Sequence, residues 1–189
     1  MKLVIASNNR HKIAEIKSIL AGKFDQILSL SEAGIEVDPE ENGATFAENA
    51  LIKARACYAL AGCACLADDS GLMVDALNGE PGVYSARYAG EPCNDENNNA
   101  KLLENLDGTE NRTAHFVSVV ALVDGEREIT AEGKTSGTIL LEGRGTGGFG
   151  YDPLFYAFEL GKTYAEATQE EKNGISHRAK ALQGLVKLI

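Results

Sequence analysis

Residues 2–9, Lys-Leu-Val-Ile-Ala-Ser-Asn-Asn, decide the fold class because an apolar run passes directly into a sequence that favours the start of a helix. Ser and Asn side chains accept hydrogen bonds from the free backbone N–H groups of a first helical turn. Apolar residues then recur at helical spacing, at Ile13, Ile16, Ile19 and Leu20. The stretch predicts a buried strand followed at once by a helix, which is typical of α/β proteins.

A second helix and a second buried strand are predicted next along the chain. Thr45 and Glu48 form a capping box, and Gly62 follows the last periodic residue of this helix. Residues 63–67 are short and apolar, which indicates a buried strand. We expect this strand to end at the acidic pair Asp68-Asp69.

The second half of the chain adds a long antiparallel strand pair. Residues 113–123 are rich in Val and Phe, Asp124-Gly125 is a hairpin turn signal, and the return strand runs over about 127–136. A glycine loop and a terminal helix follow. The whole pattern predicts an α/β protein with a mixed sheet and helices near both ends, and its polar clusters fall where strands end.

Length and composition favour one globular domain that spans residues 1–189. Hydrophobic residues make up 44% of the chain and charged residues 24%. No apolar run reaches the roughly 20 residues that span a bilayer, and the N-terminus is too short and weakly charged for a signal peptide. The net charge of -10 argues against nonspecific binding to nucleic acid or membranes, although it leaves room for a small anion.

Four cysteines, at positions 57, 63, 65 and 93, match neither a paired zinc pattern nor a redox Cys-x-x-Cys motif. Cys63 and Cys65 lie in an apolar segment, where a free cysteine behaves as a small hydrophobic residue. We interpret the cysteines as structural and free, which favours a cytoplasmic location.

The first candidate motif is Ser7-x-Asn9-x-x-Lys12-x-x-Glu15, at the first strand-to-helix junction. Free N–H groups and a partial positive charge at a helix N-terminus suit a phosphate. Ser7 and Asn9 add side-chain donors, and Lys12 lies one turn into the helix. A capped helix with a surface lysine is the plainer alternative.

Two acidic segments are candidates for a metal site. Asp68-Asp69 precede Ser70-Gly71, and Glu40-Glu41 lie in the loop that enters the second helix. A carboxylate can hold Mg²⁺ or take a proton from water, and Mg²⁺ takes only one or two protein carboxylates beside substrate phosphates. An ordinary Asp-Asp-Ser-Gly turn and solvated loop acids are the alternatives.

Residues 143–150 contain five glycines, which allow the backbone to approach a ligand closely. The segment has neither the Lys-Ser/Thr of a Walker A loop nor the preceding strand of a dinucleotide fingerprint. Phe149 and Tyr151 could stack on a base, or serve as core aromatics beside a turn.

Residues 172–178 carry Lys172, His177 and Arg178 just before the terminal helix. Lys and Arg supply only hydrogen-bond donors, and His can supply one. Such donors could read the O6 acceptor of a 6-keto purine and disfavour the amino group of adenine. The alternative is a set of surface charges that cap a helix.

These motifs occur together and in an order that resembles the inosine triphosphate pyrophosphatase family, also called the dITP/XTP pyrophosphatases or Ham1-like proteins. The resemblance is strongest to the bacterial members. The resemblance covers nearly the whole chain. Its six ordered motifs are Ser7-x-Asn9-x-x-Lys12, Thr45 to Ala54, Ala67 to Gly71, Pro81 to Tyr88, Gly147 to Pro153 and Lys172 to Arg178.

The resemblance implies an Mg²⁺-dependent enzyme that cleaves deaminated purine nucleoside triphosphates such as ITP, dITP and XTP into the monophosphate and pyrophosphate. It also implies a homodimer with an elongated mixed sheet and two lobes around a central cleft. Asp69 matches the general base and magnesium ligand, and Glu41 the other metal carboxylate, with Glu40 as the alternative. The implied substrate-binding residues are Ser7, Asn8, Asn9, Arg10, His11, Lys12, Lys53, Ser70, Phe149, Gly150, Tyr151, Asp152, Lys172, His177 and Arg178.

The mechanism expected from these matches places Mg²⁺ between Glu41 and Asp69, and the triphosphate against Lys12, Lys53 and the helix N-terminus. Asp69 takes the proton from water, and Asp68 is a candidate to share that work. Three other functions compete with this one: a Maf-type pyrophosphatase, a noncatalytic nucleotide sensor, and a structural protein in which the cysteines bind a metal.

Overall fold

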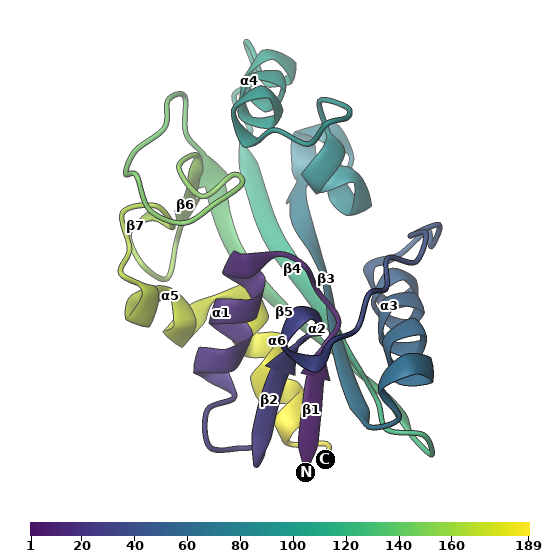
Figure 1. The fold of residues 1–189 in the computed structure, drawn as a ribbon. Coiled ribbons are helices and arrows are strands. Elements are labelled where there is room, and N and C mark those ends of the chain that lie inside the picture. The colour runs from purple at the N-terminus through teal and green to yellow at the C-terminus, as the bar shows by residue number, and fades with distance from the viewer. The chain divides into compact units, whose positions relative to one another are not determined.

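The computed structural model describes residues 1–189, and its strands form one seven-stranded sheet in the order β2-β1-β3-β4-β5-β6-β7 (Figure 1). β1 is parallel to β2 and β3, whereas β6 is antiparallel to β5 and β7. The predicted α/β class with a mixed sheet and flanking helices is confirmed. The strands are β1 (Lys2–Ile5), β2 (Gln26–Ser29), β3 (Ala64–Val74), β4 (Thr113–Val123), β5 (Glu128–Ile139), β6 (Phe155–Ala157) and β7 (Lys162–Thr163).

Six α-helices and two short 3₁₀ helices connect these strands. No helix is both long and apolar enough to cross a membrane. The helices are α1 (Arg10–Ile19), α2 (Leu30–Ala33), α3 (Phe46–Ala61), η1 (Asp75–Leu77), η2 (Gly82–Arg87), α4 (Asp95–Asn105), α5 (Gln169–Ile175) and α6 (His177–Val186).

The chain divides into two compact units, and each contains segments that are distant in the sequence. The first unit holds residues 1–69, 118–133 and 178–189, and the second holds 70–117 and 134–177. Strands β3, β4 and β5 each run from one unit into the other.

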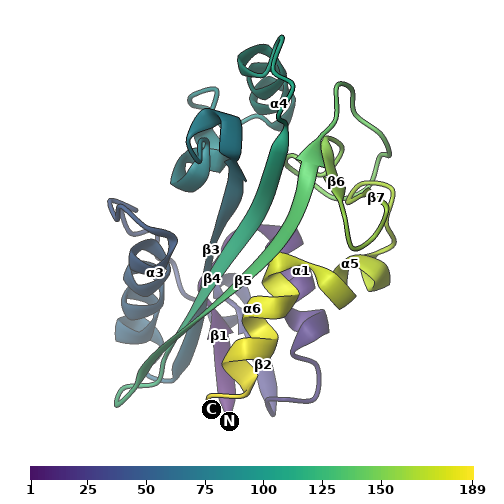
Figure 2. The ribbon, with the colours of Figure 1, turned by 180° about the vertical axis from the view of Figure 1, so that it is seen from behind.

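The first unit has a helix layer on each face of its part of the sheet, with α3 on one face and α1 and α6 on the other (Figures 1 and 2). Successive strand side chains point to opposite faces, so Leu66 packs with α1 and α6 while Cys65 and Ala67 pack with α3. Cys57 of α3 lies in the same core as Cys65, and all four cysteines are free. Cys57 and Cys65 are thus core residues, whereas Cys63 is partly buried and Cys93 is exposed.

The second unit is built around an aromatic core. The ring of Phe116 lies 4.7 Å from that of Phe155 in an edge-to-face arrangement and 5.6 Å from that of Tyr164 in a stacked one. Leu102 of α4 and Leu106, which caps the C-terminal end of that helix, are fully buried in this core. The core fixes the positions of β6 and β7, two short strands that the sequence did not predict.

Local helix signals are confirmed where the sequence placed them. Asn9 caps α1, Thr45 and Glu48 form the capping box of α3, and Gly62 ends α3 in a left-handed conformation. Gly125 in the β4–β5 turn has a φ of 95°, and a Cβ there would lie 2.3 Å from the hydroxyl oxygen of Tyr58. This turn therefore requires glycine on two grounds.

Three predicted boundaries are wrong. β3 continues through Asp68 and Asp69 to Val74 instead of ending at residue 67, because sheet pairing and buried ion pairs override the local turn composition. The return strand β5 reaches Ile139. Residues 172–178 do not simply precede the terminal helix as expected: Lys172 lies within an additional helix, α5, and His177 begins the terminal helix α6 after a break at Ser176.

Candidate active site

The acidic pair of β3 projects onto two different faces of the sheet in the first unit. Asp68 follows Leu66 in the alternation and meets side chains of α1 and α6, whereas Asp69 follows Ala67 and meets Lys53 of α3. One strand thus supplies two adjacent carboxylates to two separate environments.

Asp68 belongs to a buried network of charges. Its Oδ2 atom lies 2.8 Å from Lys12 Nζ and 3.3 Å from an Arg178 guanidinium nitrogen, and Ser118 Oγ donates to its Oδ1 atom at 2.5 Å. Arg178 is 1% exposed, and its other terminal nitrogen donates to Glu15. Two carboxylates therefore hold the Arg178 guanidinium between β3 and α1.

The pKa of Asp68 reflects this network. Burial alone would raise it, but the charges of Arg178 and Lys12 and the hydroxyl of Ser118 bring the pKa well below its usual range. Asp68 is therefore ionised throughout the physiological range and is a poor proton acceptor. This result argues against the expectation that Asp68 shares the work of the general base.

Asp69 belongs to a second group, centred on the Lys53 ammonium. Lys53 Nζ lies 3.0 Å from Asp69 Oδ1 and 2.9 Å from Glu41 Oε2, and it also donates to the Asp68 carbonyl oxygen at 3.0 Å. The other oxygen of Asp69, Oδ2, is buried and has no hydrogen-bond partner. Such an atom is free to accept a proton or to bind a cation.

The pKa of Asp69 is raised, in contrast to that of Asp68. Burial is the main cause, and the nearby Lys53 and Lys12 offset it only in part. Lys53 has a raised pKa, because Asp69 and Glu41 outweigh the burial that lowers it. Two neighbouring carboxylates whose environments push their pKa values apart are typical of an acid–base site.

Glu41 is brought to this group by the loop that precedes α3. The Gly43 N–H donates to Asn49 Oδ1 at 2.8 Å, and Asn49 is buried. A Cβ on Gly43 would lie 2.6 Å from the same oxygen and 2.7 Å from Glu48 Cβ. The loop can therefore approach α3 this closely only with glycine. Of the two candidate ligands, Glu41 pairs with Lys53, whereas Glu40 is exposed.

The Ser7 to Lys12 segment starts α1 as the sequence indicated. Asn9 Oδ1 accepts hydrogen bonds from the backbone N–H groups of His11 and Lys12, and Ser7 Oγ accepts one from Asn9 N–H. Asn9 therefore caps the helix, as the plainer alternative expected. Lys12, however, is only 16% exposed in its side chain and pairs with Asp68, so it is not a surface lysine. Arg10 and His11 are exposed.

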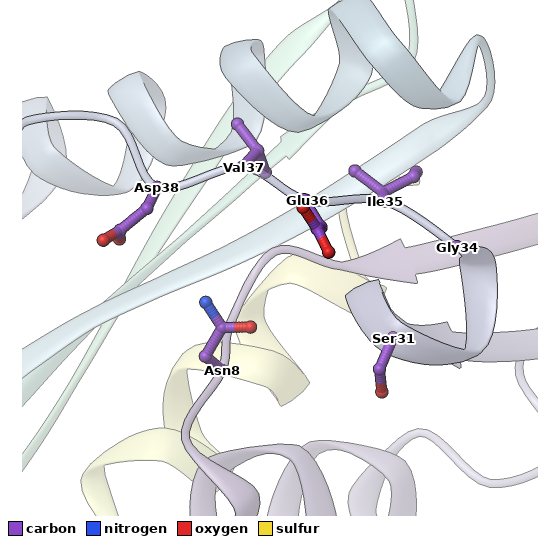
Figure 3. A pocket seen from close by; sticks show the side chains of 7 residues that line it. All are labelled: Asn8, Ser31, Gly34, Ile35, Glu36, Val37 and Asp38. Carbon is purple, nitrogen blue, oxygen red and sulfur yellow. The ribbon is translucent and has the colours of Figure 1, made fainter.

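A pocket of 830 Å³ lies beside this segment in the first unit. Asn8 borders it and faces the loop that carries Glu36 and Asp38, with Ser31 and Gly34 on α2 and its end (Figure 3). The two carboxylates repel a bare triphosphate, so an anion here would need an accompanying cation.

In the second unit, Lys172 joins the glycine loop. Its Nζ atom lies 2.7 Å from Asp152 Oδ2, both side chains are 4% exposed, and the same nitrogen lies over the rings of Phe149 and Tyr164 at 4.9 and 5.2 Å. The Phe149 N–H also donates to Asp152 Oδ2. Gly148 has a φ of 72°, and a Cβ there would lie 2.0 Å from that oxygen. Before the structure, only the family resemblance grouped these residues into one site.

The remaining predicted residues of the second unit are mostly buried. Tyr151 is 4% exposed and its hydroxyl donates to the Ser85 carbonyl oxygen, so it is a core aromatic, the alternative that the sequence left open. His177 stacks on Phe116 with ring centres 4.7 Å apart. Ser70 lies in β3 and is partly buried. Their contact with a substrate stays a prediction, as does that of Arg178 in the first unit.

The first sequence motif includes Glu15 but assigns it no role, and sequence reasoning missed Ser118 of the Asp68 network. Glu15 lies one turn after Lys12 on α1, a spacing that could have suggested a shared helix face. Ser118 lies within an apolar strand and gives no local signal.

The fold and the paired lysine–carboxylate groups define an α/β protein whose strand β3 carries two buried carboxylates, each paired with a lysine. Comparison with known proteins identifies its family. The Ham1 family model matches residues 3–188, and the chain belongs to this family.

Individual relatives agree over their full length. A dITP/XTP pyrophosphatase of Thermoanaerobacter sp. (strain X514) is 52% identical and covers 100% of this chain and 96% of its own, and one of Clostridium perfringens is 53% identical over 97% and 95%. The solved Ham1 protein of Staphylococcus aureus is 44% identical with a TM-score of 0.89, over 100% of this chain and 97% of that one.

Proposed function

We propose that this chain hydrolyses deaminated purine nucleoside triphosphates, such as dITP and XTP, to the monophosphate and pyrophosphate. The observation that carries the proposal is the Asp69–Lys53–Glu41 group, in which a carboxylate of raised pKa keeps one buried oxygen without a partner. Membership in the Ham1 family and the names of its full-length relatives support the substrate class. The proposed role is to keep these nucleotides out of DNA and RNA.

Asp69 is the proposed base. Burial makes its carboxylate more basic than an ordinary aspartate, and its free oxygen is the place where the proton of the attacking water would be accepted. Asp68 has the opposite role, because its low pKa keeps it charged as the counterion that positions Lys12. Lys12, Lys53 and the start of α1 would hold the phosphates by charge and by hydrogen bonds.

The residues present fit an Mg²⁺ ion. Glu41 and Asp69 already converge on one cation, the Lys53 ammonium, and Mg²⁺ needs only one or two protein carboxylates when substrate phosphates complete its shell. No group of three or more His, Cys, Asp or Glu side chains gathers in the chain, so a tight all-protein metal site is not expected. When bound, Mg²⁺ would offset the charge that develops on the phosphate oxygens.

Base selection is assigned to the second unit. Lys172 and Asp152 form a buried pair beside Phe149, which supplies donors, an acceptor and an aromatic face. A good donor–acceptor match to a base edge discriminates by roughly 1–3 kcal/mol. We further propose that the enzyme acts as a cytoplasmic homodimer.

Pyrophosphate release from dITP, XTP, ITP, ATP, GTP, CTP and UTP, with and without Mg²⁺, tests the proposal. We expect fast release only from the inosine and xanthosine nucleotides and only with the metal. Asp69→Asn should abolish turnover while an inosine nucleotide still binds, and this result separates an enzyme from a nucleotide sensor. Equal rates on ATP and GTP would refute the base selection.

Glu41→Gln and Glu40→Gln form a matched pair for the metal proposal. They remove the same charge from adjacent positions of one loop, but only Glu41 contacts Lys53. We expect Glu41→Gln to raise the Mg²⁺ concentration needed for half-maximal rate, and Glu40→Gln to leave it unchanged. The reverse result would assign the metal to Glu40.

A further inference from the structure

Helix α4 holds Gly150 at both its backbone polar groups. Asp95 Oδ2 accepts a hydrogen bond from Gly150 N–H at 2.7 Å, and Asn99 Nδ2 donates one to the Gly150 carbonyl oxygen at 3.0 Å. Asp95 and Asn99 are four residues apart, so they share one face of the helix. The two bonds fix the peptide groups on either side of Gly150.

Gly150 depends on such support because of its own conformation. Its φ is 61°, in the left-handed region, and a Cβ there would meet no atom within 4 Å. Local packing therefore does not hold this residue, and glycine samples many backbone conformations. The neighbouring residues are Phe149 and Tyr151, and Phe149 N–H binds Asp152. A shift at Gly150 would thus be passed directly to Phe149 and Asp152.

The helix is itself fixed in the second unit. Asn98 Nδ2 donates to the Ala86 carbonyl oxygen at 2.9 Å, and Asn98 Oδ1 accepts from Ala89 N–H at 2.7 Å. Tyr151 donates to the Ser85 carbonyl oxygen in the same 3₁₀ segment. Helix α4 is therefore a firm support for the glycine loop.

The Asn99 amide has one evident task. Its Oδ1 atom is buried without a hydrogen-bond partner, although burying an unpaired acceptor is unfavourable. The donor end of the amide, bound to Gly150, is what keeps the side chain in this orientation.

We infer that Asp95 and Asn99 are positioning residues for base selection: they hold Gly150 so that Phe149 and the Asp152–Lys172 pair keep the arrangement that receives the purine. This inference rests on the proposed function. Neither residue is assigned a role by the sequence motifs, and α4 contributes none of the residues predicted to bind substrate.

Asp95→Ala and Asn99→Ala test the inference, with Glu96→Ala as the matched control. Glu96 is exposed in the same first turn and carries the same charge as Asp95, so its removal changes the helix N-terminus equally without touching the loop. We expect KM for dITP to rise about tenfold in the double variant, with kcat within about twofold, because base contacts are equal in the ground and transition states. The single variant Asp95→Asn keeps an acceptor oxygen, and its KM should stay near the wild-type value.

Selectivity separates positioning from simple stabilisation. The ratio of kcat/KM for dITP over dATP should fall in Asp95→Ala and Asn99→Ala and stay at the wild-type value in Glu96→Ala. An unchanged KM and ratio, or an equal loss on both nucleotides that merely follows a lower melting temperature, would overturn the inference.

A readout without catalysis keeps this result distinct from the proposed function. Hydrogen exchange of the Gly150 amide, measured by NMR, should accelerate in Asp95→Ala and not in Glu96→Ala. If the wild type fails to cleave dITP, the proposed function fails. If it cleaves dITP but exchange and selectivity do not respond to Asp95, the positioning inference alone fails.

Discussion

We expect Arg178→Met to destabilise the protein strongly, because the Arg178 guanidinium is fully buried between Asp68 and Glu15. Removing one partner of a buried ion pair leaves uncompensated charge and typically costs about 3–5 kcal/mol. With a urea m-value of about 2–3 kcal/mol/M for a chain of this size, the unfolding midpoint should fall by about 1–2.5 M. Urea titration followed by far-UV circular dichroism measures this shift.

A second substitution separates lost charge compensation from lost packing. Arg178→Met leaves the Glu15 carboxylate without its partner, and Glu15→Leu in the same background removes that carboxylate. Asp68 still contacts Lys12 and Ser118. The double variant should therefore regain about half of the loss, since apolar replacement of a buried pair is often nearly neutral. Arg55→Met, which breaks the exposed pair with Glu128, should barely move the midpoint and serves as the control.

Acidification gives a further signature of the same network. The folded pKa of Asp68 lies below its unfolded value, so its contribution to stability is present above about pH 4 and is lost as pH falls through the folded pKa. The difference in unfolding free energy between wild type and Arg178→Met should therefore become smaller as the pH falls over that range. A midpoint shift below about 0.3 M at neutral pH, or strictly additive effects in the double variant, would refute this account.

Three other predictions concern Asp69, its partner Lys53 and the glycine loop. In the metal-free enzyme the Asp69 carboxyl should titrate above the usual range of an aspartate, because burial raises its pKa, and titration near pH 4 by carboxyl NMR would contradict this environment. Gly148→Ala should lower the ratio of kcat/KM for dITP over dATP at least tenfold, because the new Cβ would lie 2.0 Å from Asp152 Oδ2. Gly161→Ala is the control, because only Tyr156 Oη lies within 4 Å of a Cβ there. Lys53→Met should leave Asp69 and Glu41 to repel each other in the metal-free enzyme, so the pKa of Asp69 should rise further, and an unchanged pKa would contradict their coupling.

Helix ends and the hairpin could be predicted from the sequence because their causes are local. The Asn9 cap, the Thr45–Glu48 box and the glycine of the β4–β5 turn each depend on atoms a few residues apart. The extension of β3 could not be predicted this way. Asp68-Asp69-Ser70-Gly71 has the composition of a turn, and only partners far along the chain, such as Arg178, 110 residues after Asp68, make a buried strand possible there.

The site residues also differ in whether their signal is local in the sequence or depends on distant partners. Composition and spacing marked Asp69 and Glu41 as possible ligands, but only the order of family motifs joined them, and Lys53 between them was placed by resemblance. Glu15 stood in the first motif without a role, and Ser118 was not singled out, because their function lies in compensating a charge on another element. Asp95 and Asn99 escaped for the same reason, since what they hold is the backbone of Gly150.

The alternation of a β-strand explains how two identical neighbouring side chains acquire opposite properties. Asp68 points to the face of α1 and α6, where Arg178 and Lys12 keep it ionised, and Asp69 points to the face of α3, where burial outweighs the pull of Lys53. Had β3 ended before the pair, as the sequence suggested, both carboxylates would lie in one loop and share one environment. The unbroken strand is therefore what separates a structural counterion from a base, one residue apart.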